Sequence, residues 1–154
     1  MPAISARPGD AGDGVDDAGF AQIPFAIATG DITWQELTGP DARARLIMGP
    51  QGGFHILGRL RFEGFAPDVA VRFRVTDLAT GTLFNDPTDV LRRRDRQGLV
   101  RTPEGWESVS AELVIFTQIR TADQARGHRV RWDVELEEAS SGRRARTSRE
   151  FLVE

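Results

Sequence analysis

Apolar and polar residues alternate along much of this chain after residue 30. In residues 69–75 every odd position is apolar, and in residues 129–137 every even position is apolar while every odd position is charged. Residues 54–62 follow the same rule, with Leu57 as the exception. A period of two is typical of strands that have one face in the core and the other in water. These three segments are therefore predicted to be half-buried antiparallel strands.

Weaker alternation predicts further strands at residues 31–37, 43–48, 82–84, 98–102, 108–119 and 144–153. Residues 113–116 are apolar at every position, which predicts a strand that is central or covered by a loop. Short helical turns are expected after Asp86, where Pro87 follows an N-cap residue, and after Thr121, which has capping-box spacing to Gln124.

Seven to nine strands with no long helix predict an all-β fold. An immunoglobulin-like antiparallel β-sandwich, with one or two short helical turns in its crossovers, fits this pattern best. A jelly roll or small barrel is the alternative. The chain has no cysteine, so no disulfide holds the predicted sheets together, and cysteine-ligated zinc and thiol catalysis are excluded as well.

The N-terminal residues differ from the rest in composition. Residues 1–22 are rich in Gly, Ala and Asp and contain four acids and one arginine, so they carry the whole net charge of −3. We expect residues 1–22 to be a disordered acidic tail or tether, and residues 23–154 to be a single β-sandwich domain. That domain holds 19 acids and 19 arginines, and its neutral balance argues against nucleic-acid binding.

Residues 1–19 contain no basic start followed by an apolar segment, so no signal peptide is recognised there. Two alternatives follow: a cytoplasmic protein, or an exported one whose signal precedes this sequence. An acidic Gly/Ala spacer is typical of a surface-tethered domain. We therefore expect an exported protein, periplasmic or anchored to the outer membrane, that meets a membrane only through a lipid anchor.

A glycine-rich segment is the sharpest candidate for a binding site. It comprises Gly49, Pro50, Gln51, Gly52 and Gly53, and His55 follows on the outward side of the next strand. Such a segment could be a loop that cradles a ligand or a metal, or it could be a strained strand entry in which His55 bonds a backbone carbonyl. His55 and His128 are the only histidines, and each begins a strand. If they met and an acid completed the site, they would suit copper, zinc or nickel.

Arginines offer two other candidates. Arg59, Arg61, Arg72 and Arg74 lie at outward positions and could form an anion- or glycan-binding face. The alternative is cross-strand pairing with acids that are also expected to point outward, namely Glu112, Asp133, Glu135 and Glu137. Residues 92–96 contain four arginines and one aspartate, and we expect a solvated crossover loop there, since residues 85–105 hold no aromatic residue for base stacking.

No catalytic motif is present: there is no G-x-S-x-G, H-E-x-x-H or P-loop. We also expect no Glu within an inward-facing apolar run, where its pKa would be raised for acid–base chemistry. The sequence thus predicts a protein that is not an enzyme and uses no cofactor.

The Gly-Pro-Gln-Gly-Gly-Phe-His-Ile segment at residues 49–56, the later strand Gly-His-Arg-Val-Arg-Trp-Asp-Val-Glu-Leu at residues 127–136 and the hairpin at Gly142 together suggest a relationship. They resemble a group of uncharacterised lipoproteins of myxobacteria and related GC-rich bacteria, which share a G-P-Q-G-G-x-H strand opening after an acidic linker. This chain departs from them in lacking the lipobox cysteine and the signal segment, and in a longer crossover at residues 86–107. The resemblance implies export and an immunoglobulin-like fold, and it implies no ligand or reaction.

Two functions are therefore predicted. The first is a non-enzymatic, exported immunoglobulin-like module that interacts with a protein or a cell-surface component, with residues 49–53 and 86–97 as its binding loops. The second is a small periplasmic protein that binds copper or zinc through His55 and His128.

Overall fold

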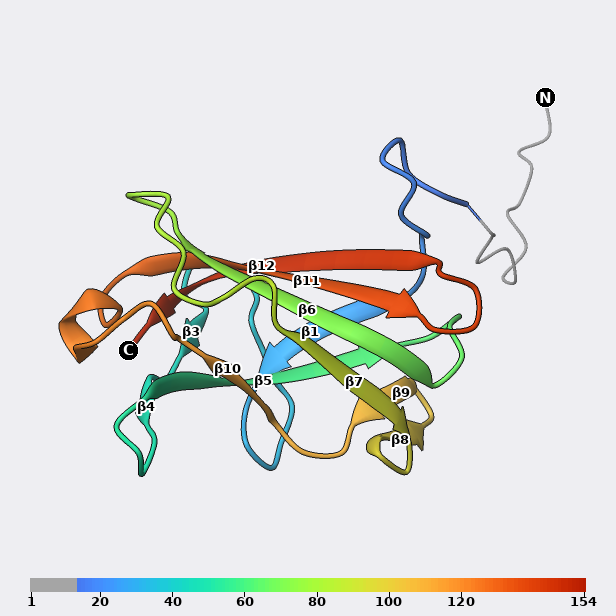
Figure 1. Cartoon of the computed structure of the whole chain (residues 1–154), viewed down its shortest axis with the longest axis horizontal. Helices are drawn as coiled ribbons and strands as arrows, with labels where there is room; N and C mark the ends of the chain where they lie inside the picture. Colours follow the sequence, from blue (N-terminus) through green and yellow to red (C-terminus); the bar gives the residue numbers. More distant parts are fainter. Residues whose placement is uncertain (1–13) are drawn as a thin grey trace.

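The computed structural model describes residues 14–154, which form twelve strands and one short 3₁₀ helix (Figure 1). The strands are β1 (Phe25–Thr29), β2 (Gln35–Glu36), β3 (Arg43–Ala44), β4 (Ile47–Met48), β5 (Phe54–Phe62), β6 (Asp68–Asp77), β7 (Val90–Asp95), β8 (Gly98–Thr102), β9 (Gly105–Ser108), β10 (Glu112–Ile115), β11 (Arg129–Glu138) and β12 (Arg144–Val153); the helix η1 is Ala122–Gln124.

The all-β class predicted from the alternating pattern is confirmed. The strands of residues 14–154 are linked by hydrogen bonds into one curled sheet in the order β2-β1-β5-β9-β8-β7-β6-β11-β12-β3, with β4 and β10 attached to β5. Most neighbours are antiparallel, but β7 pairs with β8 and β12 pairs with β3 in parallel. The predicted division into two purely antiparallel sheets of seven to nine strands is therefore not what the structure shows.

The curl closes on one side through residues 43–48, which the sequence predicts to be one strand. β3 pairs with the end of β12. Two residues separate β3 from β4, and β4 pairs with the start of β5. Between them the Leu46 N–H donates to the Glu154 carbonyl at 2.7 Å. The segment is split into two short strands because its two halves pair with different neighbours.

The core lies inside the curl and is centred on Trp132 of β11. The indole packs edge-on against Phe73 of β6, with ring centroids 5.8 Å apart, and against Phe151 of β12 at 6.5 Å. On the far side it reaches Gly58 of β5, where an added Cβ would lie 2.7 Å from the ring. The absence of a side chain at residue 58 thus lets one tryptophan connect β11 with β5.

The inward positions predicted for residues 54–62, 69–75 and 129–137 are confirmed, and β8 and β12 occupy the residues predicted for them. The helical turn after Thr121 is present as η1, where Gln124 Oε1 accepts the Thr121 N–H at 3.1 Å. The predicted helical turn after Asp86 is instead a turn in which the Thr88 N–H donates to Asp86 Oδ1 at 2.9 Å. β1, β7 and β9 were not predicted.

Residues 14–22 differ from the disordered tail that composition predicts. Phe20 is buried beneath the guanidinium groups of Arg144 and Arg146, which lie 4.7 and 4.2 Å from its ring. The Ala21 N–H donates to the Arg144 carbonyl at 2.7 Å, and Asp16 pairs with Arg146 at 3.1 Å. One aromatic residue and one acid therefore dock this part of the chain on β12. The rest of the predicted tail, residues 1–13, lies outside the described residues.

Within residues 14–154 no helix has the length and apolar character that a membrane span requires.

Candidate interaction surface

The outer surface of β6, β11 and β12 carries a ladder of charges, here called the charged face; its residues are Arg72, Arg74, Arg131, Asp133, Glu135, Glu137, Arg144 and Arg146. The register sets Arg72 opposite Glu135 and Arg74 opposite Asp133. Arg72 bonds diagonally to Glu137 at 3.5 Å. Two further pairs are Arg131–Asp133 at 3.1 Å and Arg144–Glu135 at 3.5 Å. The predicted cross-strand pairing with acids is confirmed for Arg72, while Arg74 lies opposite Asp133 in the register.

A hollow of about 710 Å³ lies on the charged face. Four arginines line it, but so do Asp133 and Glu135. Arg146 is also held by Asp16 from the N-terminal segment. Acids of the same chain hold three of these four arginines, Arg72, Arg131 and Arg146, so the hollow offers an anion less free positive charge than its lining suggests.

Arg59 and Arg61 were predicted to share this wet face, and that prediction is wrong. They lie on β5, where Arg59 is buried and its Nη1 donates to the Asp31 carbonyl at 2.7 Å. Arg61 lies under the Trp34 ring at 4.0 Å. Both arginines pair with Glu107, at 3.5 and 3.0 Å. The segment 31–36 covers this half of β5, so its arginines are not available as a ligand face.

Glu112 of β10 was predicted to point outward, and no Glu was expected within an inward apolar run; both predictions are wrong. Glu112 is 6% exposed and lies on the same side of β10 as Val114, which is buried. Both of its oxygens accept hydrogen bonds from the guanidinium of Arg93 on β7. These bonds raise the pKa of Arg93 above its ordinary value, although its partial burial acts in the opposite direction. The ion pair joins β7 to β10 where no backbone pairing between them is present in residues 14–154.

β10 was predicted to be central or covered, and the structure corrects this as well. Among the described residues it pairs only with β5, so its other edge has no neighbouring strand. Leu113 and Ile115 are each 51% exposed. An apolar run on both faces predicts burial on both faces, but here one face and one edge are left open.

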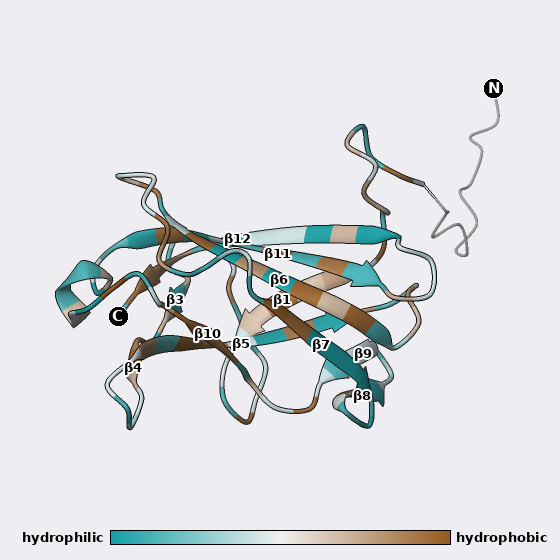
Figure 2. Cartoon of the chain, viewed as in Figure 1, coloured by the Kyte–Doolittle hydropathy of each residue, from teal (hydrophilic) through white to brown (hydrophobic). Residues whose placement is uncertain are grey.

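The exposed side of β10 continues across two neighbouring strands as a surface here called the apolar face: Ile47 of β4, His55 and Leu57 of β5, and Leu113 and Ile115 of β10. The register aligns Ile47, His55 and Ile115 in one row and Leu57 with Leu113 in the next. Directly opposite residues on neighbouring strands share a side of the sheet, so these side chains lie together. Figure 2 shows β10 in brown, in contrast to the teal and white of β12.

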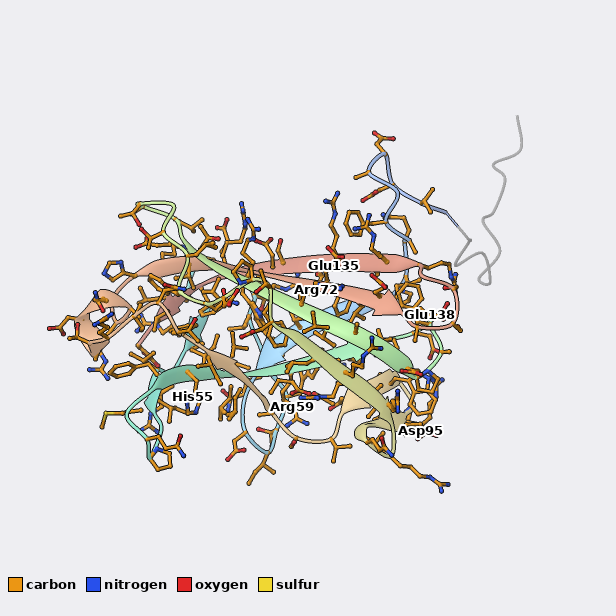
Figure 3. All side chains as sticks on the ribbon, viewed as in Figure 1. His55, Arg59, Arg72, Asp95, Glu135 and Glu138 are labelled. Carbon is orange, nitrogen blue, oxygen red and sulfur yellow. The ribbon has the colours of Figure 1, made fainter. Side chains whose placement is uncertain are left out.

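His55 belongs to the apolar face and does not add charge to it at neutral pH. Its burial lowers its pKa below the ordinary histidine value, because the charged imidazolium is disfavoured away from water. Figure 3 places His55 at the start of β5, away from Arg72 and Glu135 on the charged face.

The glycine-rich segment, comprising Gly49, Pro50, Gln51, Gly52 and Gly53, is the turn that joins β4 to β5. It is closed by its own backbone: the Gly49 N–H donates to the Gly53 carbonyl at 2.7 Å, and the Gly52 N–H donates to the Gly49 carbonyl at 2.9 Å. Gly52 has a φ of 85°, which favours glycine. The turn borders the apolar face, and binding by the turn itself stays a prediction.

The two histidines have different neighbours. His128 Nδ1 lies 2.7 Å from Asp77 Oδ2, and its ring meets Phe84 edge-on. His55 lies between Ile47 and Ile115 in the register and has no carboxylate partner among residues 14–154. No group of three or more His, Asp or Glu side chains in the described part of the chain is arranged to hold a metal ion. Copper or zinc binding through His55 and His128 stays a prediction.

Residues 86–97, the second predicted binding loop, do not form one loop. The arginine-rich run expected in a solvated crossover lies on strand β7 and the turn after it, where Arg96 has a φ of 63°. Figure 1 shows the β4–β5 turn and the β7–β8 turn at opposite ends of the molecule, so they do not make a joint site.

Sequence reasoning missed Leu113 and Ile115 as surface residues, and it missed the Arg93–Glu112 pair. The sequence does contain a signal for the burial of Glu112, because Glu112, Val114 and Phe116 lie at alternate positions and so on the same side of a strand. Comparison with models of known protein families found no match, and comparison with curated proteins found none either.

Proposed function

We propose that this chain is a non-enzymatic protein-interaction module whose partner docks on the apolar face and along the free edge of β10. The observation that carries the proposal is the half exposure of Leu113 and Ile115 on a strand with an unpaired edge. Exposed edges in natural sheets are normally protected by charged side chains, proline, a bulge or a very short strand. β10 has only four residues, but its outward positions carry neither a charge nor a proline.

Recognition through such an edge has a simple physical basis. An extended segment of a partner bonds to the open backbone groups, while alternate side chains contact the exposed face beside the edge. Leu113 and Ile115 are those alternate side chains, and Leu57 and Ile47 extend the contact surface behind them.

The non-enzymatic part of the proposal is supported by the buried acids, whose oxygens bond to neighbouring groups of the same chain. Glu112 is bonded to Arg93, and Asp77 to His128. Glu138 accepts the Ala66 N–H at 2.6 Å and bonds to Ser141 and Arg143. Carboxylates held in this way serve the fold, whereas a catalytic acid needs access to a substrate.

Export and tethering belong to the same proposal. They are supported by the acidic Gly/Ala composition of the N-terminal residues and by the resemblance to bacterial lipoproteins. The genomic reading frame upstream of this sequence tests them: a signal segment ending at a cysteine supports the tether, and an in-frame stop codon contradicts it.

The docking surface is tested by site-directed photo-crosslinking. The photoreactive residue p-benzoylphenylalanine is placed at position 113 and, as a matched control, at position 100, where Val100 of β8 is 46% exposed. We expect protein adducts from position 113 in the purified chain or in envelope extract, and only background from position 100. Adding Leu113→Asp to a chain labelled at position 115 should remove the adduct. Equal yields at positions 113 and 100 would contradict the proposal.

A further inference from the structure

We infer that the protein partner is a second copy of this chain, and that the two copies pair antiparallel through β10 about a two-fold axis beside Val114. The inference rests on the proposed function, because it names the occupant of the same edge and face.

The direction of the backbone groups on β10 follows from one hydrogen bond. The Phe116 N–H donates to the Phe54 carbonyl at 2.8 Å, which makes residues 116 and 54 a hydrogen-bonded pair of the antiparallel ladder. Such pairs alternate along the ladder, so Val114 and Glu112 also bond to β5. The N–H and C=O groups of Leu113 and Ile115 therefore point toward the open edge.

A second β10 strand satisfies these open groups in a symmetric register. With Val114 opposite Val114 of the other copy, Leu113 faces Ile115 and Ile115 faces Leu113. Each of these two facing pairs then exchanges both of its backbone hydrogen bonds. The contact is isologous, so it closes as a dimer without leaving a further open edge on either β10 strand.

Charge distinguishes β10 from β7, the strand that carries its ion-pair partner Arg93. Between residues 108 and 119 the only charged residue is Glu112, and it points inward to Arg93. Self-pairing therefore sets no like charges opposite one another. β7, which the Arg93–Glu112 pair links to β10, carries Arg92, Arg93 and Arg94, and pairing two copies through β7 would bring arginines together.

The side chains support the same register. Leu113 and Ile115 of both copies would form one apolar cluster on the outer side of the joined sheet, next to Leu57 of each copy. The neutral His55 beside Ile115 adds no repulsion at neutral pH.

Sedimentation equilibrium of the purified 154-residue chain tests the inference. We expect a monomer–dimer equilibrium in the wild type and a dimer dissociation constant raised at least about tenfold by Leu113→Lys. The matched control Val100→Lys, at a valine of similar exposure on β8, should leave the constant unchanged. Circular dichroism of both variants checks that the strand content is retained.

Cysteine pairing tests the register itself, and the natural chain has no cysteine to interfere. In the proposed dimer the Cα atoms of residues 113 and 115 of opposite copies lie about 5.5 Å apart, which suits a disulfide. Two copies of residue 113 are diagonal neighbours about 7–8 Å apart, which does not. Mixing Leu113→Cys with Ile115→Cys should therefore give a covalent dimer under mild oxidation, while each variant alone should not.

A monomer at every concentration would overturn the inference, as would a dimer equally sensitive to Leu113→Lys and Val100→Lys. Larger, open-ended assemblies would overturn it too, since they require a head-to-tail contact. If the chain is monomeric while position 113 still crosslinks to a different protein, the second copy is excluded but the proposed docking surface stands. If neither result appears, both proposals fail.

Discussion

The charged face and the apolar face are built from the same alternating pattern, yet the side chains of the first mostly have partners within the chain and those of the second are left exposed at an edge. On the charged face, the outward residues of β6, β11 and β12 meet acids and arginines across each strand boundary, with pairs such as Arg72–Glu137 and Arg144–Glu135. On the apolar face, the outward residues of β10 meet Leu57 and His55 on one side and, among residues 14–154, no strand on the other.

Alternation determines which residues point outward, while the neighbouring strands determine whether that surface is covered. On the charged face Arg72, Arg131 and Arg144 pair with acids of the same face, and Arg146 pairs with Asp16 of the N-terminal segment. The apolar face ends at the edge of β10, where residues 14–154 provide no further strand and Leu113 and Ile115 are left half exposed.

Removing the Arg93–Glu112 ion pair is expected to have the largest effect on the free energy of unfolding. Arg93→Met leaves Glu112 buried without a partner, and we expect the free energy of unfolding to fall by about 3–5 kcal/mol. The matched change on the charged face, Arg72→Met, removes a half-exposed pair and should cost less than about 1 kcal/mol. Urea unfolding measures both, and equal costs would contradict the burial of the first pair.

The contact between Trp132 of β11 and Gly58 of β5 should have the second largest effect on stability. Gly58→Ala places a Cβ 2.7 Å from the Trp132 ring, and overpacking of this kind costs about 1–3 kcal/mol. Gly53→Ala, in the turn beside the apolar face, meets no atom within 4 Å and should change stability by less than about 0.5 kcal/mol. A neutral Gly58→Ala would show that Trp132 does not lie against β5.

A pH titration separates buried charge from the exposed charged face. Burial raises the pKa of Asp77, but its hydrogen bonds from Ala79 and His128 lower it further, and the net pKa lies below the ordinary 3.8. The stabilisation by this group is therefore complete above pH 3.8 and is lost as the pH falls through the lowered pKa. Unfolding measured from about pH 5 to about pH 2 should show a smaller loss of stability in Asp77→Asn than in the wild type. The same slope in both proteins would exclude this role for Asp77.

Single changes on the charged face should have the smallest effect. Glu135→Gln is expected to lower the free energy of unfolding by about 0.5 kcal/mol, and the difference should vanish in about 1 M NaCl because exposed pairs are screened. Association through the apolar face should persist at the same salt concentration, since it depends on apolar contact and backbone hydrogen bonds. Loss of both effects in salt would remove the distinction between the faces.

The sequence pattern is sufficient where each residue's environment follows from its own strand. β8 and β12 occupy the predicted residues, and the inward positions of β6 and β11 follow their alternation. β7 was missed because Arg93 occupies an inward position, and its burial depends on Glu112, nineteen residues further along the chain. A one-sequence pattern cannot anticipate such a partner.

The candidate site was missed for a related reason. Leu113 and Ile115 have the composition of a buried strand, and composition does not reveal that, within residues 14–154, β10 pairs with a strand on one edge only. The glycine-rich turn was predicted correctly in position, next to β5, but the exposed residues beside it came from a strand some sixty residues later.

Amide hydrogen exchange at single-residue resolution reports on whether the open edge of β10 is a docking surface. The Val114 amide, directed at β5, should be protected in dilute and concentrated protein alike. The Leu113 and Ile115 amides should exchange rapidly in dilute protein and become protected as the concentration rises from about 1 µM to about 1 mM. Rapid exchange of both amides at every concentration, with envelope extract added as well as without it, would contradict the account.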